Sequence, residues 1–309
     1  MYILCKNIKS VVIEIYTKTL FDFFYNNQSI TENQQKKILD CLLKDRTSGV
    51  NIIWATNDYS ALGDGYSALD SLEYPNLYGE RILRRSVKTK LHQANRTKDK
   101  AEVFTPSWIC NIQNNLIDEQ WFGRPNVFNQ SEGEVWKTVK GNIPFNTEQN
   151  KSWQDYVKAP RLEVSCGEAP YLVSRYDSVT GAPIDVDDRI GLLDRKLRIV
   201  NENVDDENEW FKWVTYAFQS TYAYEYQGDN LFLARENLLL TFIDNMEYKF
   251  KTIPNWKQLR KISEIISWNI WQMDALTYEI PCKIKDWYTK NNKKRIIEYK
   301  SLLKGETNG

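Results

Sequence analysis

Apolar residues recur every three or four positions in five stretches of the chain, which is the spacing of a helix that buries one face. These stretches are residues 10–46, 105–118, 209–220, 230–250 and 256–267. Ser29 and Thr31 are candidate caps within the first stretch, because their hydroxyls can accept a backbone N–H at a helix start. Thr105 is the candidate cap of the second stretch, with Pro106 at the first helical position.

Short apolar runs alternate with the later helices, and they are residues 49–56, 161–164, 221–226 and 269–274. Because strands that alternate with helices build parallel sheets, the pattern predicts an α/β protein with a doubly wound parallel sheet. Two further runs, 282–288 and 295–300, predict a terminal β-hairpin. Residues 57–76 and 122–155 are rich in turn-forming residues and are expected to be loops.

The length of 309 residues allows one large or two modest domains. We expect a mainly helical N-terminal region over residues 1–100, with a basic helix at 81–100, followed by a cofactor-binding domain over residues 101–309. The chain carries 41 basic and 41 acidic residues, so its total charge does not indicate nucleic acid. The segment 81–100 nevertheless holds eight basic residues and one acid. Such a cluster either neutralises phosphates or forms a solvated helix face.

The low histidine content and the scattered cysteines exclude several classes of catalytic and metal site. The single histidine, His92, excludes Ser-His-Asp triads and HExxH metal sites unless His92 itself takes part. The five cysteines are scattered without CxxC spacing, so we expect no zinc site, no disulfide framework and a reducing compartment. The sequence shows no run long enough to span a bilayer and no signal-peptide pattern, so a cytoplasmic location without membrane contact is expected.

Three of the predicted strands end in, or run into, an acid. Glu163 belongs to the first of them, Glu225 to the second and Asp274 to the third. Ligands of parallel sheets bind beyond the carboxyl ends of the strands, where one carboxylate can accept from ribose hydroxyls and another from an adenine amino group. Small residues follow Glu163, and a helix is expected from Ala169. The interpretation is a tight turn that lets backbone amides approach a charged cofactor.

Four segments in this order resemble the adenine-specific, amino-methylating DNA methyltransferases that use S-adenosylmethionine. They are AEVFTPSWICNIQNNLID at 101–118, LEVSCGEAPYL at 162–172, AYEYQGDNLFLARENLL at 223–239 and NIWQMDAL at 269–276. The resemblance covers roughly residues 101–289. It implies an α/β fold with a Rossmann-like methyltransferase sheet, here without its full set of strands, a helical N-terminal region and a C-terminal β-hairpin.

The resemblance also implies residue roles and partners. Thr105 and Pro106 would line the methionine end of the cofactor, and Glu163, Cys166 and Gly167 would form the turn around it. Glu225 would accept from the ribose hydroxyls, and Asp274 from the adenine amino group. The implied partners are DNA and a restriction endonuclease or specificity subunit, in restriction–modification or phage-related DNA modification.

The family's catalytic signature, an acid or amide followed by two prolines and an aromatic residue, is absent from the sequence. Position along the chain favours Asp286, Trp287 and Tyr288 as the catalytic residues, with the ring stacking on a flipped base. A second candidate is the segment GNIPF, which supplies Asn142, Pro144 and Phe145 but precedes the cofactor turn. Methyl transfer by such a site requires no metal.

Two other functions remain open from the sequence. Without the proline pair, the chain would be a non-catalytic subunit that binds S-adenosylmethionine or DNA within a restriction–modification complex. Alternatively, a hairpin could bring Asp286, Glu298 and Lys300 together to bind Mg²⁺ and activate water, as in a restriction endonuclease.

Overall fold

The structure, a computed structural model, describes residues 19–77, 82–100, 102, 105–145, 151–274, 283–287 and 295–299. Its centre is a parallel sheet of β3 (Arg161–Glu163), β4 (Thr221–Glu225) and β5 (Ile270–Gln272), in the spatial order β3-β4-β5. Glu163 lies beside Ala223, and Glu225 lies beside Gln272. The prediction of an α/β protein with parallel strands is therefore confirmed at the level of class.

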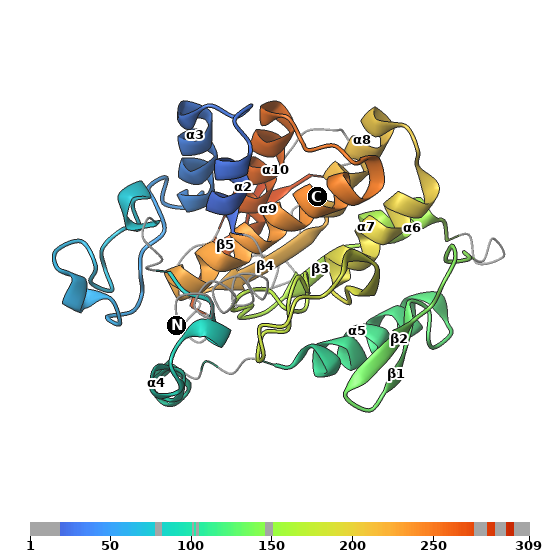
Figure 1. Cartoon of the computed structure of the whole chain (residues 1–309), viewed down its shortest axis with the longest axis horizontal. Coiled ribbons are helices and arrows are strands. Elements are labelled where there is room, and N and C mark those ends of the chain that lie inside the picture. The colour runs from blue at the N-terminus through green and yellow to red at the C-terminus, as the bar shows by residue number, and fades with distance from the viewer. Residues whose placement is uncertain are drawn as a thin grey trace, which may run out of the picture.

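Four helices connect these strands and cover one face of the sheet (Figure 1). They are α7 (Leu192–Asn203) and α8 (Glu207–Gln219) between β3 and β4, then α9 (Gly228–Phe250) and α10 (Trp256–Asn269) between β4 and β5. Ala223 and Ile270 face these helices in the main hydrophobic core. The helices begin where polar side chains satisfy free N–H groups, as Asp206 does for α8 and Asn255 for α10.

A separate hairpin covers part of the opposite face of the sheet. It consists of β6 (Lys283–Asp286) paired antiparallel with β7 (Arg295–Glu298), as the sequence predicts. Ile284 packs there against the buried Tyr224, Trp271 and Met273. The alternation of side chains along β4 and β5 thus separates two cores, because neighbouring residues of a strand point to opposite faces.

The N-terminal helices pack into the same core as the sheet. They are α2 (Leu20–Asn26) and α3 (Glu32–Leu43), and the predicted cap Thr31 does cap α3. The helix α3 lies beside α10 in Figure 1. The buried Arg235 of α9 donates to the carbonyls of Leu42 and Lys44, at 2.6 and 3.1 Å. The expected domain boundary at residue 100 therefore does not coincide with a break in packing.

The remaining elements surround one end of the sheet and its edge. They are α4 (Lys90–Lys100), α5 (Ser107–Phe122), the antiparallel hairpin of β1 (Asn129–Glu132) and β2 (Val135–Thr138), α6 (Trp153–Lys158), and the 3₁₀ turns Ser60–Leu62, Tyr74–Leu77, Arg85–Val87 and Val186–Asp188. Among the described residues, no helix combines the length and apolar character needed to cross a membrane.

Four local predictions are wrong. Residues 49–56 form isolated bridges instead of a strand. The expected loop 122–155 contains β1, β2 and the first half of α6. Pro106, with no side-chain hydrogen bond, occupies the cap position of α5 that was expected for Thr105. No helix extends from Ala169, because the carbonyls of Tyr171 and Leu172 accept the amides of Leu192 and Leu193 at the start of α7, at 2.8 and 2.9 Å, and so are not available to a helix of their own.

Candidate cofactor site at the carboxyl edge of the parallel sheet

The segments that follow β3, β4 and β5 meet at one edge of the sheet. The carboxylate Oε2 of Glu225 accepts the N–H of Gly167 at 2.8 Å, which joins the ends of β3 and β4. The N–H of Met273 donates to the carbonyl of Glu225 at 3.2 Å, which joins the ends of β4 and β5. Asp274 follows directly and is half-buried. The structure therefore brings the three predicted carboxylates to the same edge.

The turn after β3 has an unusual backbone. Ser165, Gly167 and Ala169 have φ values of 50°, 54° and 65°. This left-handed region is open to glycine at little cost but strains Ser165 and Ala169. The N–H of Cys166 donates to the carbonyl of Tyr224 at 2.9 Å and fastens the turn to β4. The side chain of Cys166 is buried, so its part is to fill space beneath the turn.

Glu163 and Glu225 hold the shape of this turn. Glu163 accepts the amides of Tyr171 and Leu172 at 3.3 and 3.2 Å. Oε1 of Glu225 accepts the amides of Tyr226 and Gln227, both at 3.0 Å. Burial raises the pKa of both carboxyl groups, and the backbone N–H donors offset part of that rise. With Gly167, Glu225 uses three of about four acceptor positions of a carboxylate, so one remains on Oε2.

The start of α5 lies against the turn, as the resemblance implies for Thr105 and Pro106. The carbonyl of Thr105 accepts from Ser178 Oγ at 2.7 Å, and the Tyr171 hydroxyl donates to Gln113 Oε1 of α5. Asn114 Nδ2 of α5 donates to the carbonyl of Tyr171 at 3.0 Å. The Thr-Pro segment and the turn are thus neighbours, although 58 residues separate Thr105 from Glu163 in the sequence.

Tyr226 is the residue at this edge that sequence reasoning missed. It directly follows Glu225, is 39 % exposed, and its carbonyl accepts from Gln272 Nε2 of β5 at 2.7 Å. An exposed ring directly after Glu225 offers a flat surface for an adenine. Its position directly after Glu225, an acid at the end of a strand, is the sequence feature that could have identified it as a candidate adenine-binding residue.

A buried cluster of charges covers the start of α9, beyond the carboxyl edge. This buried charge cluster consists of Lys88, Arg96, Glu102 and Asp229, and the partly exposed Asp58 pairs with Arg96 at its rim. Asp229 is fully buried and lies 3.1 Å from Lys88 Nζ and 3.0 Å from Arg96 Nη1. Burial alone would raise the pKa of Asp229, but Lys88 and then Arg96 outweigh it and lower that pKa. Part of the basic segment 81–100 is therefore neutralised inside the protein, which neither sequence interpretation anticipated.

The predicted catalytic residues lie away from this edge. Trp287 is buried, and its Nε1 donates to Asn269 Oδ1 at 2.8 Å. Asn269 precedes β5, so Trp287 lies at the amino edge of the sheet, opposite Glu163 and Glu225. Asp286 pairs with Arg295 in the hairpin register beside it, and Tyr288 lies outside the described residues. The structure does not bring Asp286 and Trp287, which position along the chain favoured as catalytic residues, to the edge of Glu163 and Glu225, because their hairpin packs on a face of the sheet.

The second catalytic candidate is also remote from the turn. Asn142 Nδ2 donates to the carbonyl of Glu202 at 3.5 Å, near the end of α7. Phe145 packs among Trp121, Phe122 and Tyr156. Asn142 thus contacts the end of α7, and Phe145 packs against the end of α5 and α6.

The hairpin does not assemble the carboxylates of a nuclease site. Asp286 lies opposite Arg295, whereas Glu298 lies opposite Lys283, three positions along the strand. At about 3.4 Å per residue, the two acids are roughly 10 Å apart, and an odd separation places them on opposite faces. Lys300 lies outside the described residues. Within the described part of the chain, no three His, Cys, Asp or Glu side chains are grouped to hold a metal ion.

The chain matches no protein-family model, no curated protein and no solved structure. Its function is therefore argued from the geometry of the carboxyl edge.

Proposed function

We propose that the chain binds S-adenosylmethionine at the carboxyl edge of β3, β4 and β5, as an adenine-N6 DNA methyltransferase with a Rossmann-like fold. The observation that carries the proposal is the placement of Glu225, whose Oε2 keeps one acceptor position directly beside the amide of Gly167. A strand-end carboxylate next to a tight, left-handed turn is the arrangement that holds a ribose in dinucleotide folds.

The neighbouring residues have complementary roles in this proposal. Glu225 accepts from one ribose hydroxyl through the remaining position on Oε2, Tyr226 stacks on the adenine, and Asp274 accepts from its amino group. Thr105 and the turn at Gly167 enclose the methionine end. Because Glu163 and Glu225 fix the turn through backbone amides, the site is shaped before the ligand arrives, which lowers the entropic cost of binding.

When bound, S-adenosylmethionine supplies an electrophilic methyl group. The residues of the edge bind and orient it, and such positioning accounts for much of the acceleration in transfer reactions. DNA would approach α4, where Lys90 and Lys98 are exposed beside the buried charge cluster. Neutralised phosphates would make that binding weaken with added salt.

A second candidate function is a non-catalytic, cofactor-binding subunit of a modification complex. The placement of Asp286 and Trp287 at the amino edge favours it, because the described carboxyl edge then lacks the acid and ring expected to hold the target base. In this case the chain binds S-adenosylmethionine but transfers no methyl group unless a partner supplies the acceptor site.

Calorimetric titration with S-adenosylmethionine tests the binding step. We expect saturable binding by the wild type and at least about tenfold weaker binding by Glu225→Gln, which exchanges one acceptor oxygen for a donor. Glu209→Gln removes an exposed carboxylate of α8 and should bind like the wild type. Absence of heat for the wild type at millimolar ligand, or equal affinities for the two variants, would overturn the proposal.

Transfer of labelled methyl groups to DNA of mixed sequence separates the two functions. Transfer that survives in Asp286→Asn shows an acceptor site independent of the hairpin and supports the enzyme. Binding without transfer by the wild type supports the non-catalytic subunit. Transfer that Asp286→Asn abolishes, with binding unchanged, would contradict the placement of Asp286 away from the site.

A further inference from the structure

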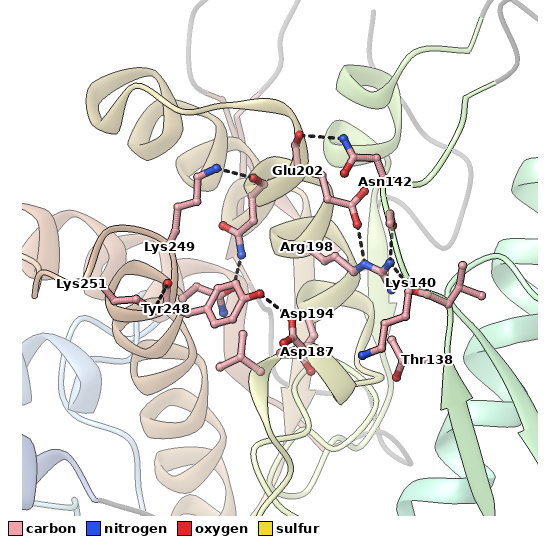
Figure 2. A pocket seen from close by; sticks show the side chains of 15 residues that line it. Thr138, Lys140, Asn142, Asp187, Asp194, Arg198, Glu202, Tyr248, Lys249 and Lys251 are labelled. Atoms are coloured by element: carbon pink, nitrogen blue, oxygen red, sulfur yellow. Dashed lines mark hydrogen bonds and ion pairs between the residues drawn. The ribbon is translucent and has the colours of Figure 1, made fainter.

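A cavity of about 590 Å³ lies at the far end of α9, away from the proposed cofactor edge. Figure 2 shows its walls, which come from the segment after β2, the turn before α7, α7 itself and the end of α9. Tyr248 lines it, 20 residues along α9 from Gly228, or about 30 Å at 1.5 Å per residue. The volume lies within the usual range for ligand sites, about 300–1,000 Å³.

Most polar groups of the cavity wall already have partners. Arg198 donates to Glu202 and to the carbonyls of Val139 and Gly141, which fastens the segment after β2 to α7. Lys249 Nζ donates to Asp205 at 2.6 Å and to the carbonyl of Asn201 at 2.8 Å. These contacts make the cavity a formed feature of the fold whose walls do not depend on a ligand.

Two groups of the lining, Asp194 Oδ1 and Lys140 Nζ, make no hydrogen bond to a described residue. Asp194 is 6 % exposed; its Oδ2 accepts the amides of Ser174 and Gly191, but its buried Oδ1 has no hydrogen-bond partner in the structure. Lys140 is exposed and makes no hydrogen bond or ion pair with any described residue. A buried carboxylate oxygen without a donor is costly, so it favours a ligand or water that carries an N–H or O–H.

The walls between these groups suit an aromatic, anionic ligand. The ring of Tyr248 is held in place by the bond from its hydroxyl to Asp187 at 2.7 Å. Lys251 Nζ lies 5.4 Å from the centre of this ring and donates to the carbonyl of Tyr248 at 2.9 Å, which uses one of its three N–H groups. A residue with an unpartnered carboxylate oxygen, an aromatic ring and two ammonium groups with free donors therefore line one cavity.

From this arrangement we propose that the cavity binds a nucleoside phosphate. The base donates an amino or ring N–H to Asp194 Oδ1 and packs against Tyr248, and the phosphate lies between Lys140 and Lys251. The ligand is a free mononucleotide or a nucleotide of single-stranded DNA, which share this chemistry. The site is separate from the proposed methyl-donor site and does not depend on it.

Binding of the four 5′-mononucleotides, measured by calorimetry and by protein-observed NMR, tests the proposal. We expect at least one to bind with saturation, and the corresponding nucleoside and inorganic phosphate each to bind at least about tenfold more weakly. A single-stranded oligonucleotide, titrated in parallel, identifies the source: tighter binding than the mononucleotide indicates DNA, and weaker binding indicates the free nucleotide.

Variants of Lys140 and Asp194 test whether the nucleotide binds in this cavity. Lys140→Gln removes an exposed ammonium group without breaking a described contact, and we expect about tenfold weaker nucleotide binding. Asp194→Asn keeps an acceptor for Ser174 and Gly191 but presents an N–H₂ to the cavity, so the preference should shift toward bases with a carbonyl. Lys212→Gln, an exposed lysine of α8, is the matched control and should bind like the wild type.

Several outcomes would overturn the proposal. They are no saturable binding by the wild type at millimolar nucleotide, wild-type affinity in Lys140→Gln, and inorganic phosphate that binds as tightly as the nucleotide. If Asp194→Asn does not fold, Tyr248→Leu decides between base recognition and phosphate binding, because its ring is 41 % exposed and its loss should still weaken nucleotide binding. Titration with S-adenosylmethionine should be unchanged in Lys140→Gln.

Discussion

The substitution Asp229→Asn tests whether the buried charge cluster stabilises the fold. Asp229 is fully buried and accepts from Tyr59 Oη at 2.8 Å in addition to its two cations. Neutralising it leaves Lys88, whose side chain is 2 % exposed, without its only ion pair among the described residues. Arg96 keeps Glu102 and Asp58. An unpaired buried charge costs about 3–5 kcal/mol, so we expect a loss of that size in the free energy of unfolding.

Urea denaturation followed by tryptophan fluorescence measures this loss. The midpoint should fall while the slope stays the same, because the variant exposes the same surface on unfolding. Glu209→Gln breaks an exposed ion pair with Lys212, whose side chains are 46 and 52 % exposed, and should leave the midpoint unchanged within error. A loss below about 1 kcal/mol for Asp229→Asn, or a loss equal to that of the control, would refute the argument that burial makes this pair strong.

The contribution of Asp229 to the free energy of unfolding should also depend on pH in a predictable direction. The pKa of Asp229 is lowered in the folded protein, so the folded state binds fewer protons than the unfolded chain near the unfolded pKa of about 3.9. The stabilisation by ionised Asp229 is therefore fully present above that pKa and is lost as the pH falls below it. The difference between wild type and variant should be constant from about pH 8 to pH 5 and should shrink below about pH 4.

Three further predictions concern the packing of the sheet. In Gly228→Ala the new Cβ would lie 2.0 Å from the backbone carbonyl oxygen of Ile53, so we expect a loss of about 2–3 kcal/mol in unfolding free energy, measured in urea. Burial, and then the nearby Arg161, lowers the pKa of Lys196 in the folded protein, so the unfolded chain binds more protons than the folded one. The free energy of unfolding of the wild type, relative to that of Lys196→Met, should therefore rise from pH 7 to pH 9, by up to about 1.4 kcal/mol per pH unit. Trp287→Phe removes the bond to Asn269 and should cost about 1 kcal/mol without changing the affinity for S-adenosylmethionine, whereas a change in affinity would place Trp287 at the cofactor site.

Local pattern was enough to predict most of the regular elements after residue 160. The strands β3, β4 and β5, the helices α8, α9 and α10 and the terminal hairpin all carry their own periodicity and end signals. It also predicted that Glu163, Glu225 and Asp274 lie at one edge of the sheet, since parallel strands place their carboxyl ends together. The helix expected from Ala169 does not extend, because the carbonyls of Tyr171 and Leu172 accept the amides of Leu192 and Leu193, 21 residues further along the chain.

Only the tertiary structure determines where the other charged and aromatic side chains lie and which partners they contact. The basic segment reads as a surface helix, yet Lys88 and Arg96 are buried because Asp229, more than 130 residues away, supplies the opposite charge. Asp286 and Trp287 follow the expected order of motifs, but the hairpin packs on a face of the sheet and carries them to the amino edge. The cavity between Asp194 and Lys140 has no sequence signal, because its walls come from four separate segments. Periodicity specifies which side of an element is buried, and only the packed chain specifies which distant group it meets.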